Sequence, residues 1–123
     1  MSTAVLPPVN VVTVPLTVNL DVYQGDDFYL DLTVQDSLGN PIGLSGWTVQ
    51  STVRPAPGAK VVATFTGTVD TVNNTVIHLH LPHVEAQNLQ RKGVWDCQVV
   101  DLSGNVLTLV AGTVTASLEV TTG

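Results

Sequence analysis

Apolar and polar residues alternate with a period of two along most of the chain, which is the pattern of a β-strand with one buried face. The repeats are separated by Gly, Asn and Asp, the residues that favour turns. About eight strands at intervals of about 8–12 residues predict an all-β fold, either a sandwich or a closed barrel. The inward-facing sets are Leu16, Val18, Leu20 and Val22; Phe28, Leu30, Leu32 and Val34; Trp47, Val49 and Val53; Val61, Ala63 and Phe65; Ile77, Leu79 and Leu81; Trp95, Cys97 and Val99; Leu107 and Leu109; and Val114, Ala116, Leu118 and Val120.

One short helix is expected between these strands, from about Pro82 to Gln90. Proline is tolerated in a first helical turn because its missing N–H needs no partner there, and Gly93 ends the segment. Two loops, at residues 36–40 and 101–105, share the pattern Asp-x-x-Gly-Asn. We interpret them as one turn chemistry used twice, in which Asp and Asn bond the local backbone and Gly adopts a positive φ. An internal duplication is the alternative.

The first fifteen residues differ from the rest, because they are apolar but interrupted by Pro7, Pro8 and Pro15. Prolines exclude a helix and disfavour a central strand. We therefore predict an extended N-terminal arm at residues 1–15, followed by a single β-sandwich domain at residues 16–123. Such an arm satisfies its backbone groups best by lying across a neighbouring protein or adding to a sheet edge. The candidate partner-contact residues are Val5, Leu6, Pro7, Pro8, Val9, Val11, Val12 and Val14.

Composition narrows the classes of function. Charged residues are only 11% of the 123 residues and the net charge is -6. The four cations Arg54, Lys60, Arg91 and Lys92 are dispersed, so no basic stripe for nucleic acid exists. The hydrophobic content of 44% argues against disorder, and no apolar run approaches the length of about 20 residues that a membrane helix needs. The N-terminus also lacks the features of a secretory signal, which predicts folding in a reducing cytosol.

Three histidines are the first candidates for a metal site: His78, His80 and His83. Alternation places His78 and His80 on the outward face of one strand, with His83 just beyond it. No carboxylate or thiol stands at an interval diagnostic of zinc. We interpret the three as exposed or subunit-interface histidines, with a metal site as the alternative.

An acidic patch and a thiol are the other candidates for chemistry. Asp26, Asp27 and Asp31 lack the tight loop and the number of oxygen ligands that Ca²⁺ needs, so we interpret them as a solvated turn beside Gly25. Cys97 falls on the inward phase of its strand, where burial makes a thiol inert. Motifs of nucleophilic serines, phosphate-binding loops and zinc proteases are missing from the sequence. We therefore expect neither an enzyme nor a cofactor.

Two sets of residues resemble known families. The stretch Gly93-Val94-Trp95-Asp96-Cys97 resembles the Gly-x-Tyr-x-Cys stretch of immunoglobulin domains, with Trp95 in place of the tyrosine. A second, ordered set consists of Asp21-x-Tyr23-Gln24-Gly25-Asp26-Asp27-Phe28, Val34-x-Asp36-x-x-Gly39-x-Pro41-Ile42-x-Leu44-x-Gly46-Trp47, Leu89-x-x-x-Gly93-x-Trp95 and Asp101-x-x-Gly104. This set resembles a recurrent module of tailed-bacteriophage virion proteins, found at the N-terminus of baseplate upper proteins and in small immunoglobulin-like head and tail proteins. The resemblance covers about residues 16 to 121 and implies an immunoglobulin-like antiparallel β-sandwich.

The resemblance implies a non-enzymatic structural protein of a bacteriophage virion. The apolar arm and the low charge favour a capsid decoration or minor capsid protein, which forms a homo-oligomer and contacts the major capsid protein or other virion proteins. We expect it to assemble in the host cytoplasm and to lie on the outer surface of the virion, docking through the arm and its Thr-rich sheet surfaces. One alternative is a baseplate or tail-tip module. The other is a host-surface carbohydrate-binding module with Trp47, Tyr23 or Tyr29 as stacking platforms.

Overall fold

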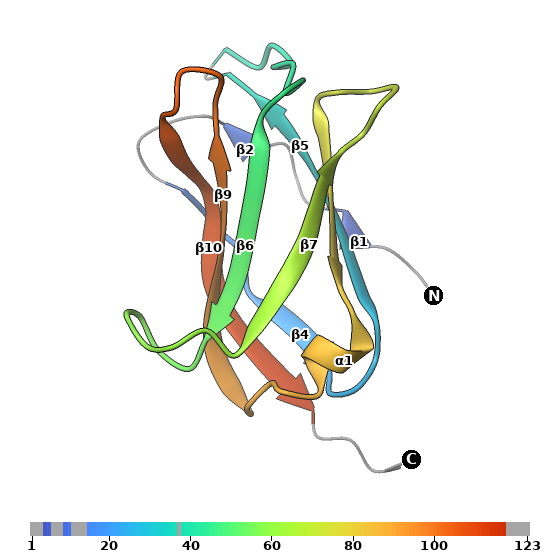
Figure 1. Ribbon diagram of the computed structural model, residues 1–123, viewed down its shortest axis with the longest axis vertical. Coiled ribbons are helices and arrows are strands. Elements are labelled where there is room, and N and C mark those ends of the chain that lie inside the picture. The colour runs from blue at the N-terminus through green and yellow to red at the C-terminus, as the bar shows by residue number, and fades with distance from the viewer. Residues whose placement is uncertain (1–3, 6–8, 11–14, 37, 118–123) are drawn as a thin grey trace.

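The alternating segments become strands because pairing satisfies their backbone groups while one face of each strand is buried. The computed structural model describes residues 4–5, 9–10, 15–36 and 38–117 (Figure 1). One short helix, α1 (His83–Ala86), follows β8, and the predicted all-β fold is confirmed. The strands are β1 (Ala4–Val5), β2 (Val9–Asn10), β3 (Leu16–Thr17), β4 (Leu20–Tyr23), β5 (Phe28–Gln35), β6 (Thr48–Arg54), β7 (Ala63–Val69), β8 (Val76–Leu81), β9 (Lys92–Val100) and β10 (Val106–Ser117).

The strands form one curled mixed sheet in the order β1-β5-β8-β7-β6-β9-β10-β3, with β2 also beside β5 and β4 also beside β10. The strand β7 joins the two halves, because its residues 63–65 pair with β6 and its residues 66–69 pair with β8. Figure 1 shows the resulting curl, with β6, β9 and β10 facing β5 and β8 across the core. The strand order is compatible with an immunoglobulin-like sandwich, and that finer assignment stays a prediction.

The short N-terminal strands cover both edges of the sheet. β1 and β2 pair in parallel with β5, and β3 and β4 pair in parallel with β10. The sheet is therefore mixed, and the predicted antiparallel arrangement is wrong for β3 and β4. β1 and β2 lie in the segment predicted as an arm and pair with the chain's own sheet. Since unpaired edges invite aggregation, this covering protects the long strands β5 and β10.

The predicted strand at residues 16–22 is divided at Val18 and Asn19. The Val18 carbonyl accepts a hydrogen bond of 2.8 Å from the indole Nε1 of Trp95. The amide oxygen of Asn19 accepts hydrogen bonds from the backbone N–H and the hydroxyl of Thr113 on β10. The Val18 N–H still bonds the carbonyl of Ala111 on β10 at 3.0 Å. The Val18 carbonyl and the neighbouring Thr113 N–H bond side chains instead, and this interruption of the ladder explains why one alternating segment gives two strands.

The helix is shorter than predicted, since it ends at Ala86 and not near Gln90. After it the backbone N–H groups of Asn88 and Leu89 bond the carbonyls three residues back, which is a tighter turn than an α-helix. Leu89 then enters the core, and Gln24 donates to its carbonyl at 3.0 Å. The burial of Leu89 explains the early helix end, because the chain has to turn toward the core.

The core contains most of the predicted inward-facing residues, including Trp95, Cys97 and Val99. The last two predicted strands are one continuous strand, β10, and predicted Leu118 and Val120 lie outside the described residues. A bulge between Thr108 and Val110 shifts the register of β10 against β9. Both Leu109 and Val110 are buried as a result. The bulge explains why the alternation changes phase within a single strand.

Candidate functional site

The three histidines proposed as a cluster, His78, His80 and His83, each contact an aspartate, and no aspartate is shared by all three. His78 contacts Asp31 through Nδ1 at 2.7 Å and Asp70 through Nε2 at 2.8 Å. His80 and His83 instead both contact Asp27, at 3.0 and 3.4 Å. The described part of the chain contains no group of three or more His, Cys, Asp or Glu side chains arranged to hold a metal ion. The three histidines therefore act as separate partners of carboxylates in this structure.

The bridge at His78 has a defined charge state. Both ring nitrogens face carboxylates, which are acceptors when ionised, so the doubly protonated imidazolium fits this position best. Asp31 first and Asp70 second raise the pKa of His78 above its usual value of 6.5. The backbone N–H of Asn73 first and His78 second hold the pKa of Asp70 at about 2. The bridge ties β8 to β5 and to the β7–β8 loop.

This bridge makes stability depend on pH. A group whose pKa is raised by folding stabilises the folded state fully below its unfolded pKa, and this stabilisation is lost as the pH rises through the folded pKa. We therefore expect the thermal midpoint of the wild type to fall as the pH is raised from about 6 to about 9. The variant His78→Gln should show a smaller fall, measured by circular dichroism melting. His83→Gln, a more exposed histidine, is the control, and an equal fall in all three proteins would contradict the role of His78.

The acidic patch is less solvated than predicted. Asp27 accepts hydrogen bonds from the His80 ring and from the backbone N–H of His83, and these contacts lower its pKa, with His80 contributing most. Asp31 belongs to the His78 bridge, while Asp26 is exposed. The expected turn is present, with Gly25 at a φ of 87°. Two of the three carboxylates thus connect β5 and its preceding turn to β8 and α1.

The thiol of Cys97 is buried, as predicted. Burial first and the charge of Asp96 second raise its pKa to about 12. Since the thiolate is the nucleophilic form, this cysteine is a core residue without nucleophilic character at neutral pH.

The two Asp-x-x-Gly-Asn loops have the same geometry. In each, one carboxylate oxygen of the Asp accepts backbone N–H bonds of 2.9 Å from the residues two or four positions later. Gly39 and Gly104 both have a φ of 86°, and an added β-carbon would be strained there. The expected turn chemistry is thus present in both loops, at Asp36 and at Asp101. Asp70 similarly accepts N–H bonds within the β7–β8 loop.

Three loops lie together at one end of the molecule, at the top of Figure 1: β5–β6, β7–β8 and β9–β10. Asn74 joins the first two, because its carbonyl accepts from the Leu44 N–H at 2.8 Å and its amide donates to the Ser45 hydroxyl at 3.0 Å. The Leu102 side chain lies against Gly46, which joins the first loop to the third. We call the described residues of these loops, 36, 38–47, 70–75 and 101–106, the loop end.

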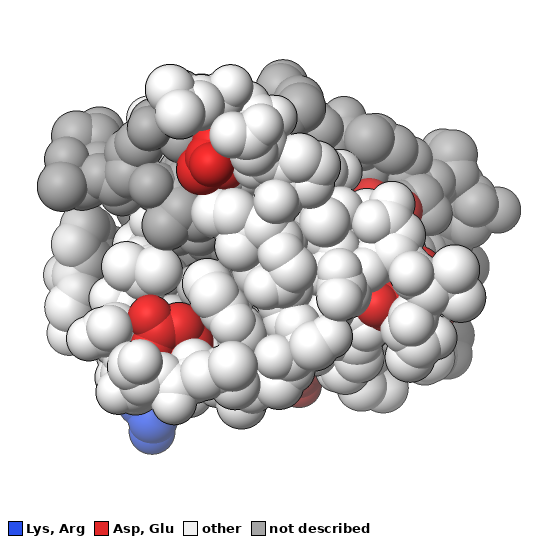
Figure 2. All heavy atoms as spheres, turned by 90° about the horizontal axis from the view of Figure 1, so that it is seen from above, with Lys and Arg blue, Asp and Glu red and all other residues white. Residues whose placement is uncertain are grey.

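The loop end presents aliphatic side chains to solvent. Val72 is 95% exposed, Leu38 85%, Leu102 76% and Val106 59%. Figure 2 looks onto this end and shows a largely uncharged surface with a few carboxylates and blue atoms only at its margin. Sequence reasoning missed these residues, although a signal existed: an aliphatic residue inside a polar Asp-x-x-Gly-Asn turn has no local structural purpose. Four exposed aliphatic side chains gathered on three adjoining loops make this end a candidate interaction surface.

All four Lys and Arg residues lie toward the other end, where β6 finishes and β9 begins. Within the described residues, the ion pairs involve histidine and none involves Lys or Arg. Two hollows of about 380 and 350 Å³ lie beside these cations on β6, β9 and β10. We call Arg54, Arg91 and Lys92, with these two hollows, the basic face.

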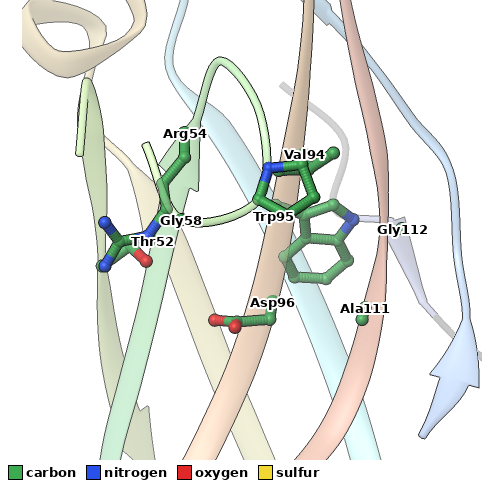
Figure 3. Close-up of a pocket in the computed structure, with 9 residues that line it drawn as sticks. Thr52, Arg54, Gly58, Val94, Trp95, Asp96, Ala111 and Gly112 are labelled. Carbon is green, nitrogen blue, oxygen red and sulfur yellow. The ribbon is translucent and has the colours of Figure 1, made fainter. Parts of the chain in front are cut away.

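The larger hollow combines apolar and charged groups (Figure 3). The side chains of Arg54 and Asp96 extend to one side of it, and Trp95 and Ala111 lie on the other. Burial raises the pKa of Asp96, and the nearby Arg54 partly opposes this shift. Arg54 also donates to the carbonyl of Ala59, which holds it beside the β6–β7 loop. The hollow therefore offers an apolar wall to a ligand, opposite Arg54 and Asp96, which lie close together.

A third hollow lies on the outer face of β5, β8 and β7. It is lined by Tyr29, Asp31, Thr66, Thr68, His78, Leu79 and His80 and has a volume of about 480 Å³. Tyr29 stacks on His80 with ring centroids 4.4 Å apart and an angle of 8° between the planes. Of the other aromatic residues named for sugar stacking, Trp47 is half-buried and Tyr23 is partly exposed.

Only part of the predicted N-terminal contact segment can be located. Val5 and Val9 lie in β1 and β2, whose backbones pair with β5 of the same chain. The other candidates lie outside the described residues: Leu6, Pro7, Pro8, Val11, Val12 and Val14.

No helix among the described residues has the length and apolar character needed to span a membrane. Comparison with known proteins adds no assignment, since no protein-family model and no curated protein sequence matches the chain.

Proposed function

We propose that this chain is a non-enzymatic structural protein of a bacteriophage virion, a capsid decoration or minor capsid protein on the outer surface of the particle. The loop end carries the proposal. It combines four exposed aliphatic side chains with a backbone held by short-range hydrogen bonds and contacts between loops. A rigid apolar surface binds a partner at a low cost in conformational entropy. Its partners in this proposal are the major capsid protein or other virion proteins, together with further copies of the chain.

The titratable groups support a structural role over a catalytic one. His78, His80 and His83 link strands and α1 through carboxylates, and Asp36 and Asp101 organise their own turns. Catalysis needs such groups to converge on one point with the reacting atoms. In the part of the chain that the structure describes, they are spread along the sheet and the loops.

The N-terminal segment has two roles in this proposal, one within the chain's own sheet and one in binding the shell. Residues 4–5 and 9–10 cover the edge at β5, and the predicted contact residues between and after them touch the shell. Deletion of residues 2–14 should therefore have two effects. We expect loss of incorporation into particles and, because β5 becomes an open edge, increased aggregation of the isolated protein. Sedimentation of purified protein and immunoblotting of purified particles measure the two effects. Normal incorporation of the protein that lacks residues 2–14 would contradict the role of the arm in binding the shell.

The direct test of the proposal is the composition of purified virions from the source of the gene. Quantitative peptide mass spectrometry should find the protein in many copies per particle, and electron microscopy of particles lacking it should show the missing density on the head. Density lost from the tail tip would instead support the baseplate alternative. Absence of the protein from purified particles would overturn the virion proposal.

One observation favours a second function, the binding of a carbohydrate. The hollow at Tyr29 and His80 offers a stacked ring pair beside the hydroxyls of Thr66 and Thr68, and sugars bind to combinations of aromatic faces and polar groups. Glycan-array binding that is lost in Tyr29→Ala, with Tyr23→Ala as the control, would support this function.

A further inference from the structure

We infer that the loop end of one copy of this chain docks on the basic face of a second copy, so that the subunits associate head to tail. The inference rests on the proposed function in one respect, because it names the contact through which copies of the virion protein join each other. The exposed aliphatic side chains and the Lys and Arg side chains lie at opposite ends of the molecule.

The loop end offers aliphatic groups beside carboxylates. Leu38 and Leu102 each lie in a turn organised by an aspartate, and Val72 lies two residues after Asp70 in the β7–β8 loop. Neighbouring backbone N–H groups lower the pKa of Asp36, Asp70 and Asp101, so all three are ionised at neutral pH. No Lys or Arg belongs to the loop end. This surface is therefore apolar and negative.

The basic face offers the complementary groups. Its cations form no ion pair with a carboxylate of the described residues. Arg54 is held by the carbonyl of Ala59, whereas Arg91 and Lys92 are exposed and available to a partner. The side chains of Thr115 and Ser117 on β10 are small and leave the hollow beside Arg91 and Lys92 open. The larger hollow has apolar walls from Pro57, Val94 and Ala111, with Arg54 and Asp96 together on one side. An aliphatic side chain fits this hollow, and a neighbouring carboxylate finds its cations in Arg91 and Lys92 at the smaller hollow, which has no acidic residue in its lining.

Geometry favours a heterologous contact. The loop end and the start of β9 lie at opposite ends of the sheet (Figure 1), so one molecule can use both surfaces at once. Contacts of this type build rings or open chains of subunits. Addition of a neighbour's strand is less suited, because the chain's own short strands already cover β5 and β10.

Sedimentation velocity of the isolated protein tests the inference. The average mass of the wild type should rise between about 10 μM and about 1 mM protein, and the rise should be smaller at about 0.5 M than at about 0.05 M NaCl, because salt screens the charges. The loop-end variant Leu38→Asp/Leu102→Asp and the basic-face variant Arg91→Glu/Lys92→Glu should each associate at least about tenfold more weakly. Gln50→Glu, at an exposed position on β6 outside both surfaces, controls for added negative charge in general and should behave as wild type.

Mixing the two defective variants gives the decisive result. Each retains one intact surface, so an equimolar mixture should form dimers but no larger species. Circular dichroism spectra must show that both variants are folded. A wild type that is monomeric throughout, a basic-face variant that still associates as wild type, or a mixture that stays monomeric would overturn the inference. A monomeric protein that is nevertheless abundant in purified particles would overturn only this contact, whereas a self-associating protein absent from particles would overturn only the virion proposal.

Discussion

Replacing Gly112 by valine should prevent the protein from folding. A β-carbon at this position would overlap the carbonyl oxygen of Val18 and lie 2.6 Å from the carbonyl carbon. Backbone atoms cannot rotate away as a flexible side chain can, and the Val18 carbonyl is also held by Trp95. Even Gly112→Ala should cost more than about 4 kcal/mol, a large part of the stability of a small domain.

Urea unfolding followed by far-UV circular dichroism measures this effect, together with the yield of soluble protein. Gly43→Ala is the matched control, because a β-carbon on Gly43 would make only an ordinary contact of 3.5 Å with the Asn74 side chain. We expect the free energy of unfolding of this control to differ from that of the wild type by no more than about 0.5 kcal/mol. A Gly112→Ala protein as stable as the control would show that β3 and β4 do not lie against β10 as described.

The second large effect is expected at Trp95. Its side chain is buried, packs on Phe65 at a ring-centroid distance of 5.7 Å and donates to Val18 at 2.8 Å. Trp95→Ala leaves a large cavity and should lower the free energy of unfolding by about 3–5 kcal/mol. Trp95→Phe keeps an aromatic ring but removes the N–H, so it should cost less, about 1–3 kcal/mol.

Trp47→Phe is the control for Trp95→Phe, because it makes the same change of side chain at a different tryptophan. Trp47 is half-buried at the end of the β5–β6 loop, and its replacement should cost less than that of Trp95. The measurement is again urea unfolding followed by far-UV circular dichroism, since fluorescence would change with the number of tryptophans. Equal losses for Trp95→Phe and Trp47→Phe would contradict the importance of the bond to Val18.

These two predictions concern one structural unit, in which β3 and β4 are held against β10. Gly112 leaves room for the Val18 carbonyl, and the Trp95 indole binds it. Because both substitutions displace the same carbonyl, their effects should not be additive. The unit also keeps the β10 edge covered, which matters for a protein proposed to associate through its ends.

The candidate site was only partly accessible from the sequence. The repeated turn at residues 36–40 and 101–105 was recognisable, because its hydrogen bonds are local. The contact of Leu102 with Gly46 and the bonds of Asn74 to the β5–β6 loop join positions far apart in the chain. The alternation of apolar and polar residues does not indicate which loops lie together. The loop end could therefore not be predicted as one surface.

The histidines also show which features the sequence predicts and which depend on the tertiary structure. Alternation correctly placed His78 and His80 on an outward face, since facing follows from position along a strand. Their carboxylate partners depend on the register between β5 and β8, in which His78 lies opposite Asp31 and His80 opposite Tyr29. A register shift of one residue would have changed every one of these contacts.

The sequence by itself determined that this protein is all-β, which residues of most strands face inward, that Cys97 is buried, and that two loops share one turn. Each of these follows from short-range preferences of the backbone and from the period of the strand. Only the tertiary structure decided that the N-terminal strands pair in parallel with β5 and β10, that β7 pairs on both sides, and that aliphatic loops and cations lie at opposite ends. The reason is physical: the choice of partner strand depends on how distant segments pack together, and a period of two is the same for every partner.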